Sequence, residues 1–522
     1  MNAKHANPPG ASRPGQAEGP LAVIEIGAHT ARLQISQVDA DGAWESLEEV
    51  LLPMPLGHDI YRNGQISAAH TRLTGEVVRD FMKVLREYGV KTWKMVVTGA
   101  VHEAANLDLL LERVRDISGV RPELLEESEE VRLLFLAIQD VLQGRHGLEN
   151  RNAVMCMIGP DISQVLFLEK GHLRNNETVR LGTLRLREDL GGHVSASRLR
   201  ELIDPFVAAV VNSVARLSPK QKPEMFIAVG SAPRALVEMD SRSPRQPVMV
   251  MSRRAFETRF NQIAGTSPSQ LAARHQLPDY VAESLEPCCN MLGHFFEITA
   301  ADRLIVPMIS TRDALLHDLW RERTGQPDRF LPEIFSAAVH LGEKFGFDGA
   351  HARAVAGLAG QLFDALTDLH HMTPRDRLLL ELSGLLHDVG FFISSRQHHK
   401  HSYYLIRNSE LPGVSPREQE LIALISRYHR RATPRASHLE YMAQPPAGRV
   451  LVTKLAALLR LADALDRSHR QRIRTIRVDQ QEDRLVLTAS APGDLTLERL
   501  GLDRKADLLK DVYGLKAVLE EA

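Results

Sequence analysis

Hydrophobic and polar positions alternate in two different ways along this chain. Between residues 21 and 325, short apolar runs with a period of two are followed by longer stretches with helical spacing. From about residue 328 to residue 470 only the helical spacing remains, and two alternating runs and a short helical segment follow. The pattern predicts two α/β lobes, then an all-helical domain, then a small C-terminal α+β subdomain.

The same pattern sets the domain boundaries. Residues 1–20 are rich in Pro, Gly and polar residues, so we predict a disordered tail. Each lobe begins with strand, turn and strand, at residues 21–38 and 153–173. In the first lobe Ser128 is the predicted N-cap of a helix over residues 128–142. We place lobe 1 at residues 21–145, lobe 2 at 146–325, the helical domain at 326–470 and the C-terminal subdomain at 471–522.

Side chains that can bind metals recur on the apolar faces of the predicted helices. The run LLLELSGLLHDVGFF (378–392) ends an apolar helix with an adjacent His and Asp, a pair that is costly to bury without partners. Other helical segments carry His or Asp at the same spacing as their apolar residues. The candidate ligands are His351, His387, Asp388, His401, His429 and Asp463.

A single buried histidine is a ligand in roughly one case in ten and is otherwise a satisfied core residue. Six such residues on five helical segments instead favour a metal ion held between helices. Imidazole and carboxylate ligands suit a divalent ion (Mg, Mn, Fe or Zn), and no cysteine lies nearby, which argues against a structural zinc site.

These residues carry a resemblance to known proteins. The order of His351, His387-Asp388 and Asp463 resembles the H…HD…D signature of the HD phosphohydrolase superfamily. The segments HHKHSYYLI, RYHRR and LLRLADALD resemble its subgroup attached to the exopolyphosphatase/guanosine pentaphosphate phosphohydrolase (Ppx/GppA) family. The resemblance implies that Asp388 is both a metal ligand and a catalytic residue, and it implies a possible homodimer.

The N-terminal half resembles the same family, whose two lobes have the actin-like (ribonuclease H-like) ATPase fold. LAVIEIGAHTARL, TGAVHEAAN, ESEEVRLLFLAI, TVRLGTLRL and IAVGSAPRAL match successive family blocks. The resemblance implies that Glu129 is the general base that activates water. It also implies a set of phosphate-binding positions, namely Gly27, Thr30, Arg32, Gly182, Gly230 and Ser231.

The phosphate loops depart from the family pattern. Glu25 stands where the family has Asp, and Ala28-His29-Thr30 replaces Ser-Asn-Ser. His102 replaces an arginine, which removes a fixed cation. In the second loop, Met157 replaces a carboxylate expected to position magnesium, and Pro160-Asp161 removes an N–H donor and adds a negative charge. We therefore predict that the lobes keep the fold and have lost the original catalysis.

Composition and charge limit the compartments and the binding partners that we expect for this protein. A net charge of −2 and a pI near 6.9 give no overall field for nucleic acid or membrane, and no apolar run reaches membrane-spanning length. Three cysteines cannot form a disulfide framework, so we expect a reducing, cytoplasmic setting. The expected partner is a phosphorylated small molecule or polyphosphate.

Three functions remain open. The first is a metal-dependent phosphohydrolase that acts from the HD centre on a phosphate ester or anhydride of a nucleotide-like substrate. The second is an exopolyphosphatase or guanosine pentaphosphate phosphatase that acts from Glu129 in the cleft between the lobes. The third is a non-catalytic sensor of a phosphorylated ligand. Intact HD ligands favour the first over the third, and the altered loops weigh against the second.

Overall fold

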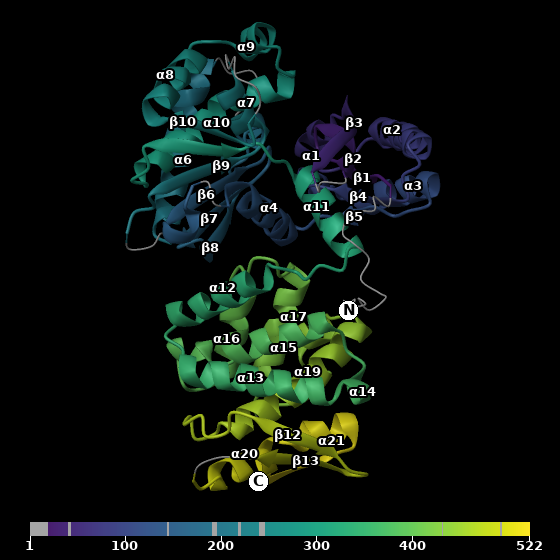
Figure 1. The fold of residues 1–522 in the computed structure, drawn as a ribbon, viewed down its shortest axis with the longest axis vertical. Coiled ribbons are helices and arrows are strands. Elements are labelled where there is room, and N and C mark those ends of the chain that lie inside the picture. The colour runs from purple at the N-terminus through teal and green to yellow at the C-terminus, as the bar shows by residue number, and fades with distance from the viewer. Residues whose placement is uncertain are drawn as a thin grey trace, which may run out of the picture. The chain divides into compact units, whose positions relative to one another are not determined.

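The computed structural model describes residues 19–39, 43–143, 146–189, 196–217, 221–239, 246–430, 432–490 and 493–521 (Figure 1). The predicted disordered tail therefore lies, up to residue 18, outside the described residues. The chain forms two compact units. The first comprises Met1–His172 and Asn176–Arg329, and the second comprises Leu173–Asn175 and Phe330–Ala522.

The first part of unit 1 is built on a sheet with the order β3-β2-β1-β4-β5. The predicted hairpin at residues 21–38 is confirmed, because β1 and β2 pair antiparallel, and β4 adds to β1 in parallel. The alternating apolar residues of β1 and β2 are buried against the helices of this lobe. The elements are β1 (Leu21–Ile26), β2 (Thr30–Val38), β3 (Trp44–Pro53), α1 (Leu56–Asn63), α2 (Ala68–Glu87), β4 (Thr92–Val97), η1 (Gly99–Glu103), α3 (Leu107–Ser118) and β5 (Glu123–Leu124).

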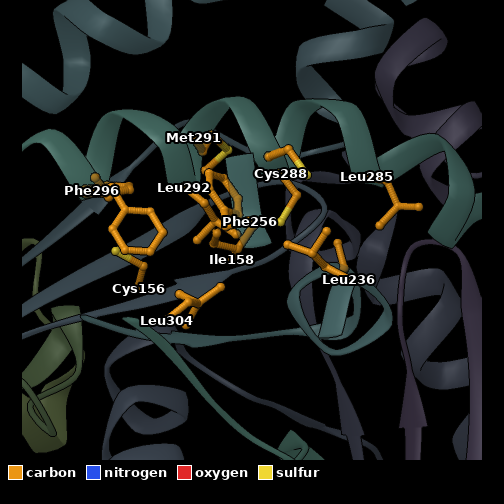
Figure 2. Close-up of a cluster of buried hydrophobic side chains, with 14 of the residues drawn as sticks. Cys156, Ile158, Leu236, Phe256, Leu285, Cys288, Met291, Leu292, Phe296 and Leu304 are labelled. Atoms are coloured by element: carbon orange, nitrogen blue, oxygen red, sulfur yellow. The ribbon is translucent and has the colours of Figure 1, made fainter. Parts of the chain in front are cut away.

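The second part of unit 1 has a sheet with the order β10-β11-β9-β6-β7-β8. Helix α10 packs on it through Cys288, Leu292 and Phe296, which lie in one buried apolar cluster with Cys156 of β6 (Figure 2). The elements are α4 (Glu127–Leu142), β6 (Ala153–Ile158), β7 (Ser163–Glu169), β8 (His172–Val179), α5 (Arg185–Asp189), α6 (Ala196–Ala215), β9 (Met225–Val229), α7 (Ser231–Glu238), β10 (Val248–Ser252), α8 (Arg253–Ala264), α9 (Pro268–His275), α10 (Asp279–Glu297), β11 (Arg303–Pro307) and α11 (Thr311–Arg323).

Two local features of unit 1 differ from the sequence prediction. Glu126, not Ser128, is the N-cap of α4, so the helix begins one residue earlier than predicted. Helix α11, which falls within the predicted lobe 2, packs against β1 and α4. The chain therefore returns to the first sheet before unit 1 ends, and α11 brings polar side chains from the second half of the unit to the first.

Unit 2 begins with a bundle of helices, as the helical spacing predicts. Helix α13 packs against α15 and α19, and Gly384 lets α15 approach the backbone of Ala356 closely. Two strands and a helix of the subdomain are also confirmed, whereas β14 was not predicted. The elements are α12 (Leu331–Lys344), α13 (Gly349–Ala365), α14 (Thr367–His370), α15 (Pro374–Leu386), η3 (Val389–Phe392), α16 (His398–Arg407), α17 (Pro416–Arg427), α18 (Leu439–Met442), α19 (Pro446–Leu465), β12 (Ile476–Gln480), β13 (Arg484–Ala489), α20 (Thr496–Lys505), α21 (Asp507–Tyr513) and β14 (Lys516–Glu521).

Across the described part of the chain, no helix is both long and apolar enough to cross a membrane.

Candidate functional site

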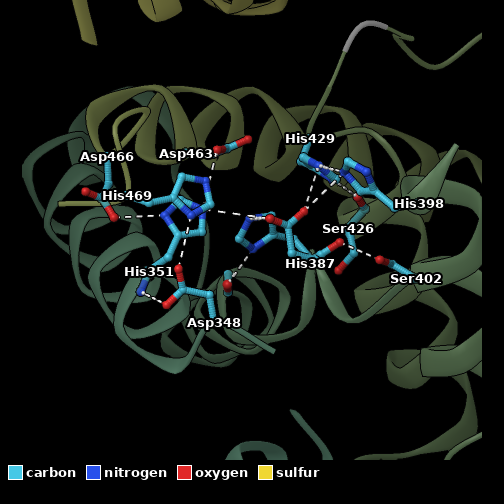
Figure 3. A network of polar contacts seen from close by, with 12 residues as sticks. Asp348, His351, His387, His398, Ser402, Ser426, His429, Asp463, Asp466 and His469 are labelled. Carbon is cyan, nitrogen blue, oxygen red and sulfur yellow. Dashed lines mark hydrogen bonds and ion pairs between the residues drawn. The ribbon is translucent and has the colours of Figure 1, made fainter. Parts of the chain in front are cut away.

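A cluster of histidine and aspartate side chains lies among the helices of unit 2 (Figure 3). Each comes from a different place in the bundle, and all are buried except Asp388, which is partly exposed. The predicted members are His351 in the first turn of α13, His387 at the C-cap of α15, the adjacent Asp388, His429 two residues beyond α17, and Asp463 in α19.

The ligand-type atoms of this cluster approach one another closely. Those of His351, His387 and Asp463 lie within 4.8 Å of each other, and so do those of His387, Asp388 and His429. The Nε2 atoms of His387 and His429 are each 3.4 Å from a carboxylate oxygen of Asp388. The Nε2 of His351 is 3.8 Å from Oδ1 of Asp463. These separations are longer than good hydrogen bonds, so the nitrogen and oxygen atoms surround a common volume that a cation fits.

The other ring nitrogen of each histidine is already used. Nδ1 of His387 donates to the carbonyl oxygen of Gly384 at 2.8 Å, and Nδ1 of His429 donates to that of Ser426 at 2.6 Å. Nδ1 of His351 donates to Asp466 at 2.8 Å. A carbonyl oxygen only accepts, so Nδ1 carries a proton and Nε2 is the nitrogen that faces the cluster. Among the described residues, Nε2 of His351 and His387 is buried without a hydrogen-bond partner. This arrangement is the one that metal-binding histidines adopt.

Helix α16 contributes a different histidine from the one predicted. Nε2 of His398 lies 3.2 Å from Oδ1 of Asp388 and 3.2 Å from Nε2 of His429. His401, three residues later, is only half-buried, and among the described residues no side-chain contact joins it to the cluster. The run HHKH contains three histidines, and sequence spacing alone did not identify the one that faces the cluster.

The charges of the cluster favour a cation. Burial would raise the pKa of Asp388, but His387 and the other imidazoles hold it well below its usual range. Burial would likewise raise the pKa of Asp463, but the Lys505 ammonium and His387 lower it. Burial would lower the pKa of His387, yet the two carboxylates raise it to about 9. Both carboxylates are thus anionic at neutral pH, and a bound metal ion would displace the proton of His387.

The C-terminal subdomain supplies a cation that sequence reasoning missed. The ammonium of Lys505, at the end of α20, contacts Oδ2 of Asp463. The fully buried Arg460 of α19 holds this segment, because it donates to the carbonyl oxygen of Lys505 at 2.9 Å and pairs with Asp507. Lys505 lies far from the helical motifs in the sequence, so no local signal pointed to it. His469 is a second missed member; its ring stacks on that of His351 at 3.7 Å.

Unit 1 contains a cavity of about 250 Å³ between its two sheets. Most of the predicted phosphate-binding residues line it, namely Gly27, Thr30, Arg32, Gly230 and Ser231. Gly182 is not among the lining residues, although the adjacent Thr183 is. The structure thus brings together turns that are separated by more than two hundred residues in the sequence.

The structure does not bring the predicted base to this cavity. Glu129 binds Arg132 through its two oxygens, at 2.7 and 2.8 Å, and does not line the cavity. The next residue, Glu130, lines it and accepts a hydrogen bond from Thr311 of α11 at 2.8 Å. Burial raises the pKa of Glu130 to about 7. Glu130 is therefore the glutamate of this pair that is placed for proton transfer in the cavity.

Two groups in the cavity that could bind phosphate, the amide of Ala100 and the guanidinium of Arg312, are already bound to carboxylates. Oδ2 of Asp161 accepts a hydrogen bond from the amide of Ala100 at 2.7 Å. Arg312 pairs with Glu25 at 2.9 Å. Burial raises the pKa of the Asp161 carboxyl to about 6. An incoming phosphate would have to displace these carboxylates, so the cavity is poorly suited to a polyanion.

Comparison with known proteins connects unit 2 to a phosphatase family. Residues 336–505 match the family model described as Ppx/GppA phosphatase, domain III. A guanosine-5'-triphosphate,3'-diphosphate pyrophosphatase of Photobacterium profundum is 22% identical over 515 residues, 96% of this chain and 98% of its own length. The protein of the same name from Vibrio parahaemolyticus is 20% identical over 459 residues, 84% of this chain and 86% of its own.

Solved structures agree at the level of the fold. A Ppx/GppA family member from Aquifex aeolicus superimposes with a TM-score of 0.50 and 20% identity over 58% of this chain and 98% of its own. An exopolyphosphatase from Cytophaga hutchinsonii gives a TM-score of 0.51 and 16% identity over 59% of this chain and 99% of its own. These similarities support the predicted actin-like fold.

The N-terminal part of the chain thus has the fold of these solved structures, and residues 336–505 are similar to domain III of Ppx/GppA phosphatases. Together, the comparisons support the Ppx/GppA phosphatase family for this chain.

Proposed function

We propose that this protein is a phosphohydrolase of the Ppx/GppA type whose working centre is an HD-type metal site in unit 2. The substrate would be a phosphate ester or anhydride of a nucleotide-like molecule. One observation carries the proposal: His351, His387 and His429 bind protein acceptors through Nδ1 and turn Nε2 toward the carboxylates of Asp388 and Asp463. Such a set is expensive to bury unless a cation compensates it.

The residues present fit a divalent ion. His351, His387, Asp388 and Asp463 would hold one ion, and His398 with His429 would hold a second ion beside Asp388. The mixed nitrogen and oxygen donors suit Mn, Fe, Zn or Mg. A bound ion would supply Lewis-acid activation of the phosphoryl group and of the attacking water.

The chain's own cations fit an anionic substrate at this centre. Lys505 lies on Asp463, and Nη1 of Arg430 lies 3.5 Å from Nδ1 of His398. Both positive groups stand beside the cluster and could neutralise charge that develops on a phosphoryl oxygen. Asp388 is the partly exposed member, so substrate would approach on its side.

A second candidate is phosphate hydrolysis in the cavity of unit 1, with Glu130 rather than Glu129 as the base. Its pKa of about 7 suits a general base near neutral pH. The names of the relatives as guanosine-5'-triphosphate,3'-diphosphate pyrophosphatases also favour it. The carboxylates of Glu25 and Asp161 weigh against it, since they already occupy Arg312 and the Ala100 amide.

The two candidates are separated by metal analysis and a phosphate-release screen on polyphosphate, guanosine polyphosphates and nucleotides. We expect Asp388→Asn to lose bound metal and at least 10²-fold in metal-dependent phosphate release, whereas Glu130→Gln and Glu129→Gln retain most of it. Asp503→Asn, an exposed residue of the same unit, is the matched control. Phosphate release that persists in Asp388→Asn and is lost in Glu130→Gln would assign the activity to the cavity of unit 1.

A further inference from the structure

Three consecutive apolar side chains are exposed beside the metal cluster. Phe391, Phe392 and Ile393 are 49%, 63% and 49% exposed, and they begin three residues after Asp388. Isolated exposed apolar residues are normal, but an exposed run next to a candidate catalytic centre suggests that it binds something.

The turn that carries this run is firmly held. Gly390 packs so closely on α16 that a Cβ there would overlap the carbonyl oxygen of His398 and the amide nitrogen of Ser402. Its N–H donates to Oγ of Ser402 at 2.9 Å, and this hydroxyl donates to the carbonyl oxygen of His387 at 2.6 Å. The aromatic rings are therefore displayed from a turn that is hydrogen-bonded to the metal cluster itself.

The exposed rings form one surface with the centre. The ring of Phe391 stacks on the imidazole of His398 with centroids 3.9 Å apart and an interplanar angle of 23°. His398 in turn lies 3.2 Å from Asp388. Phe392 contacts Phe345, the C-cap residue of α12, with centroids 5.5 Å apart, which extends the aromatic surface away from the cluster. One face of Phe391 is thus covered by a candidate metal ligand, and about half of its surface remains open.

Positive charge lies at the same edge. Arg430 reaches His398 at 3.5 Å, and Arg396 and Lys400, on either side of His398 in the sequence, are exposed. A ligand that binds both the cations and the exposed rings needs two different ends. One end is anionic and lies at the cations and the cluster, and the other is flat and apolar and lies against the rings. A purely apolar partner would leave the cations unused, and an inorganic phosphate chain would leave the rings unused.

We propose that Phe391, extended by Phe392, is a stacking platform for the base of a nucleotide whose phosphate lies at the metal cluster. The proposal rests on the proposed function and narrows it, because it makes the substrate a nucleoside phosphate rather than an inorganic polyphosphate. The base lies on the open face of Phe391, on the opposite side from His398. Stacking of this kind tolerates different bases, since every base has a flat π face.

The test measures binding to the full-length protein loaded with Mn²⁺. The probes are non-hydrolysable imido analogues of GTP and ATP, and tripolyphosphate as the probe without a base. We expect Phe391→Ala to weaken both nucleotide analogues by about tenfold and to leave tripolyphosphate and Mn²⁺ affinity unchanged. Phe391→Trp should retain nucleotide affinity, and Phe392→Ala should have a smaller effect. Leu439→Ala, which removes an 80% exposed apolar side chain elsewhere in unit 2, is the control.

The outcomes separate this inference from the proposed function. If the wild type binds Mn²⁺ and tripolyphosphate but Phe391→Ala leaves nucleotide affinity intact, the platform is overturned and the metal centre stands. An equal loss for all probes would assign Phe391 a structural role and also overturn the platform. A change in oligomeric state without a change in nucleotide affinity would make the run a protein interface instead. Absence of Mn²⁺ binding by the wild type would overturn both proposals.

Discussion

At the scale of single residues, the chemistry of this chain depends on which side chain of a close pair faces a site. Glu130 enters the cavity of unit 1, whereas Glu129 turns to Arg132. His398 contacts Asp388 of the histidine and aspartate cluster, whereas His401 is only half-buried and lies outside it. In each case two chemically identical groups differ in their burial and contacts, and these differences decide which of the two can act in the site.

Lys505 provides the first prediction at this scale. Its ammonium lies on Asp463, so it competes electrostatically with a metal ion for that carboxylate. We expect Lys505→Met to bind Mn²⁺ about tenfold more tightly than the wild type in calorimetric titration, a change of about 1.4 kcal/mol. Lys510→Met, an exposed lysine of α21, should match the wild type. Unchanged or weaker Mn²⁺ binding by Lys505→Met would show that the lysine does not oppose the metal.

Glu130 provides the second prediction at the scale of single residues. Burial raises its pKa from an ordinary value near 4.5 to about 7, so the folded protein binds this proton more tightly than the unfolded chain does. The stabilisation is complete below about pH 4.5 and is lost as the pH rises through 7. We expect the free energy of unfolding of unit 1 to fall, relative to Glu130→Gln, by about 2 kcal/mol between pH 5 and pH 8. Parallel pH profiles for the two proteins would refute the raised pKa.

At the scale of elements, close packing between η3 and α16 positions both the cluster and the exposed rings. Gly390 has no room for a side chain, while Gly357, on α13, has no atom near the position of a Cβ. Two glycines of the same unit therefore differ only in what surrounds them. Helix α15 depends on a similar approach, at Gly384 against Ala356.

We expect Gly390→Ala to destabilise unit 2 by about 2–3 kcal/mol, because the added methyl group displaces α16 and with it His398. Mn²⁺ affinity should fall as well. Gly357→Ala is the matched control and should be neutral or stabilising by up to about 1 kcal/mol, as expected for alanine inside a helix. Equal unfolding free energies for the two variants, measured by denaturant titration, would contradict the tight packing at Gly390.

At the scale of the whole molecule, two units with separate cores carry two separate candidate centres. The carboxylates and imidazoles of unit 2 converge in groups that could hold a cation, whereas Glu25, Glu130 and Asp161 of unit 1 bind arginine, threonine and a backbone amide. A metal ion should therefore act on one unit and leave the other unchanged.

We expect Mn²⁺ to raise the thermal unfolding transition of unit 2 alone, by the equivalent of about 2.7 kcal/mol at a hundredfold excess over Kd. A chelator should reverse the shift, and Asp388→Asn should abolish it. Calorimetric scans with and without Mn²⁺ measure both transitions. A shift confined to the thermal transition of unit 1 would show that Mn²⁺ binds to unit 1 and would contradict the prediction.

Much of this architecture follows from the sequence by itself. Period-two and helical spacing predict the two α/β parts, the helical bundle and most of its elements, because burial of one face of a strand or helix repeats with its geometry. The same spacing placed His351 and Asp463 on buried faces, and the structure brings their ligand atoms together with that of His387. Strand β14 (Lys516–Glu521) was not predicted, although it is no shorter than the predicted β12.

Only the tertiary structure decided the details of the sites. Successive residues on a helix point in directions about 100° apart, so a pair such as Glu129-Glu130 satisfies the same local pattern in either role. Elements distant in sequence make the selection: Thr311 of α11 donates a hydrogen bond to Glu130, and Nε2 of His398 lies 3.2 Å from Nε2 of His429. Lys505 reaches Asp463 only because Arg460 holds the end of α20. Local spacing determines which faces are buried, whereas contacts between distant segments determine which polar groups meet on them.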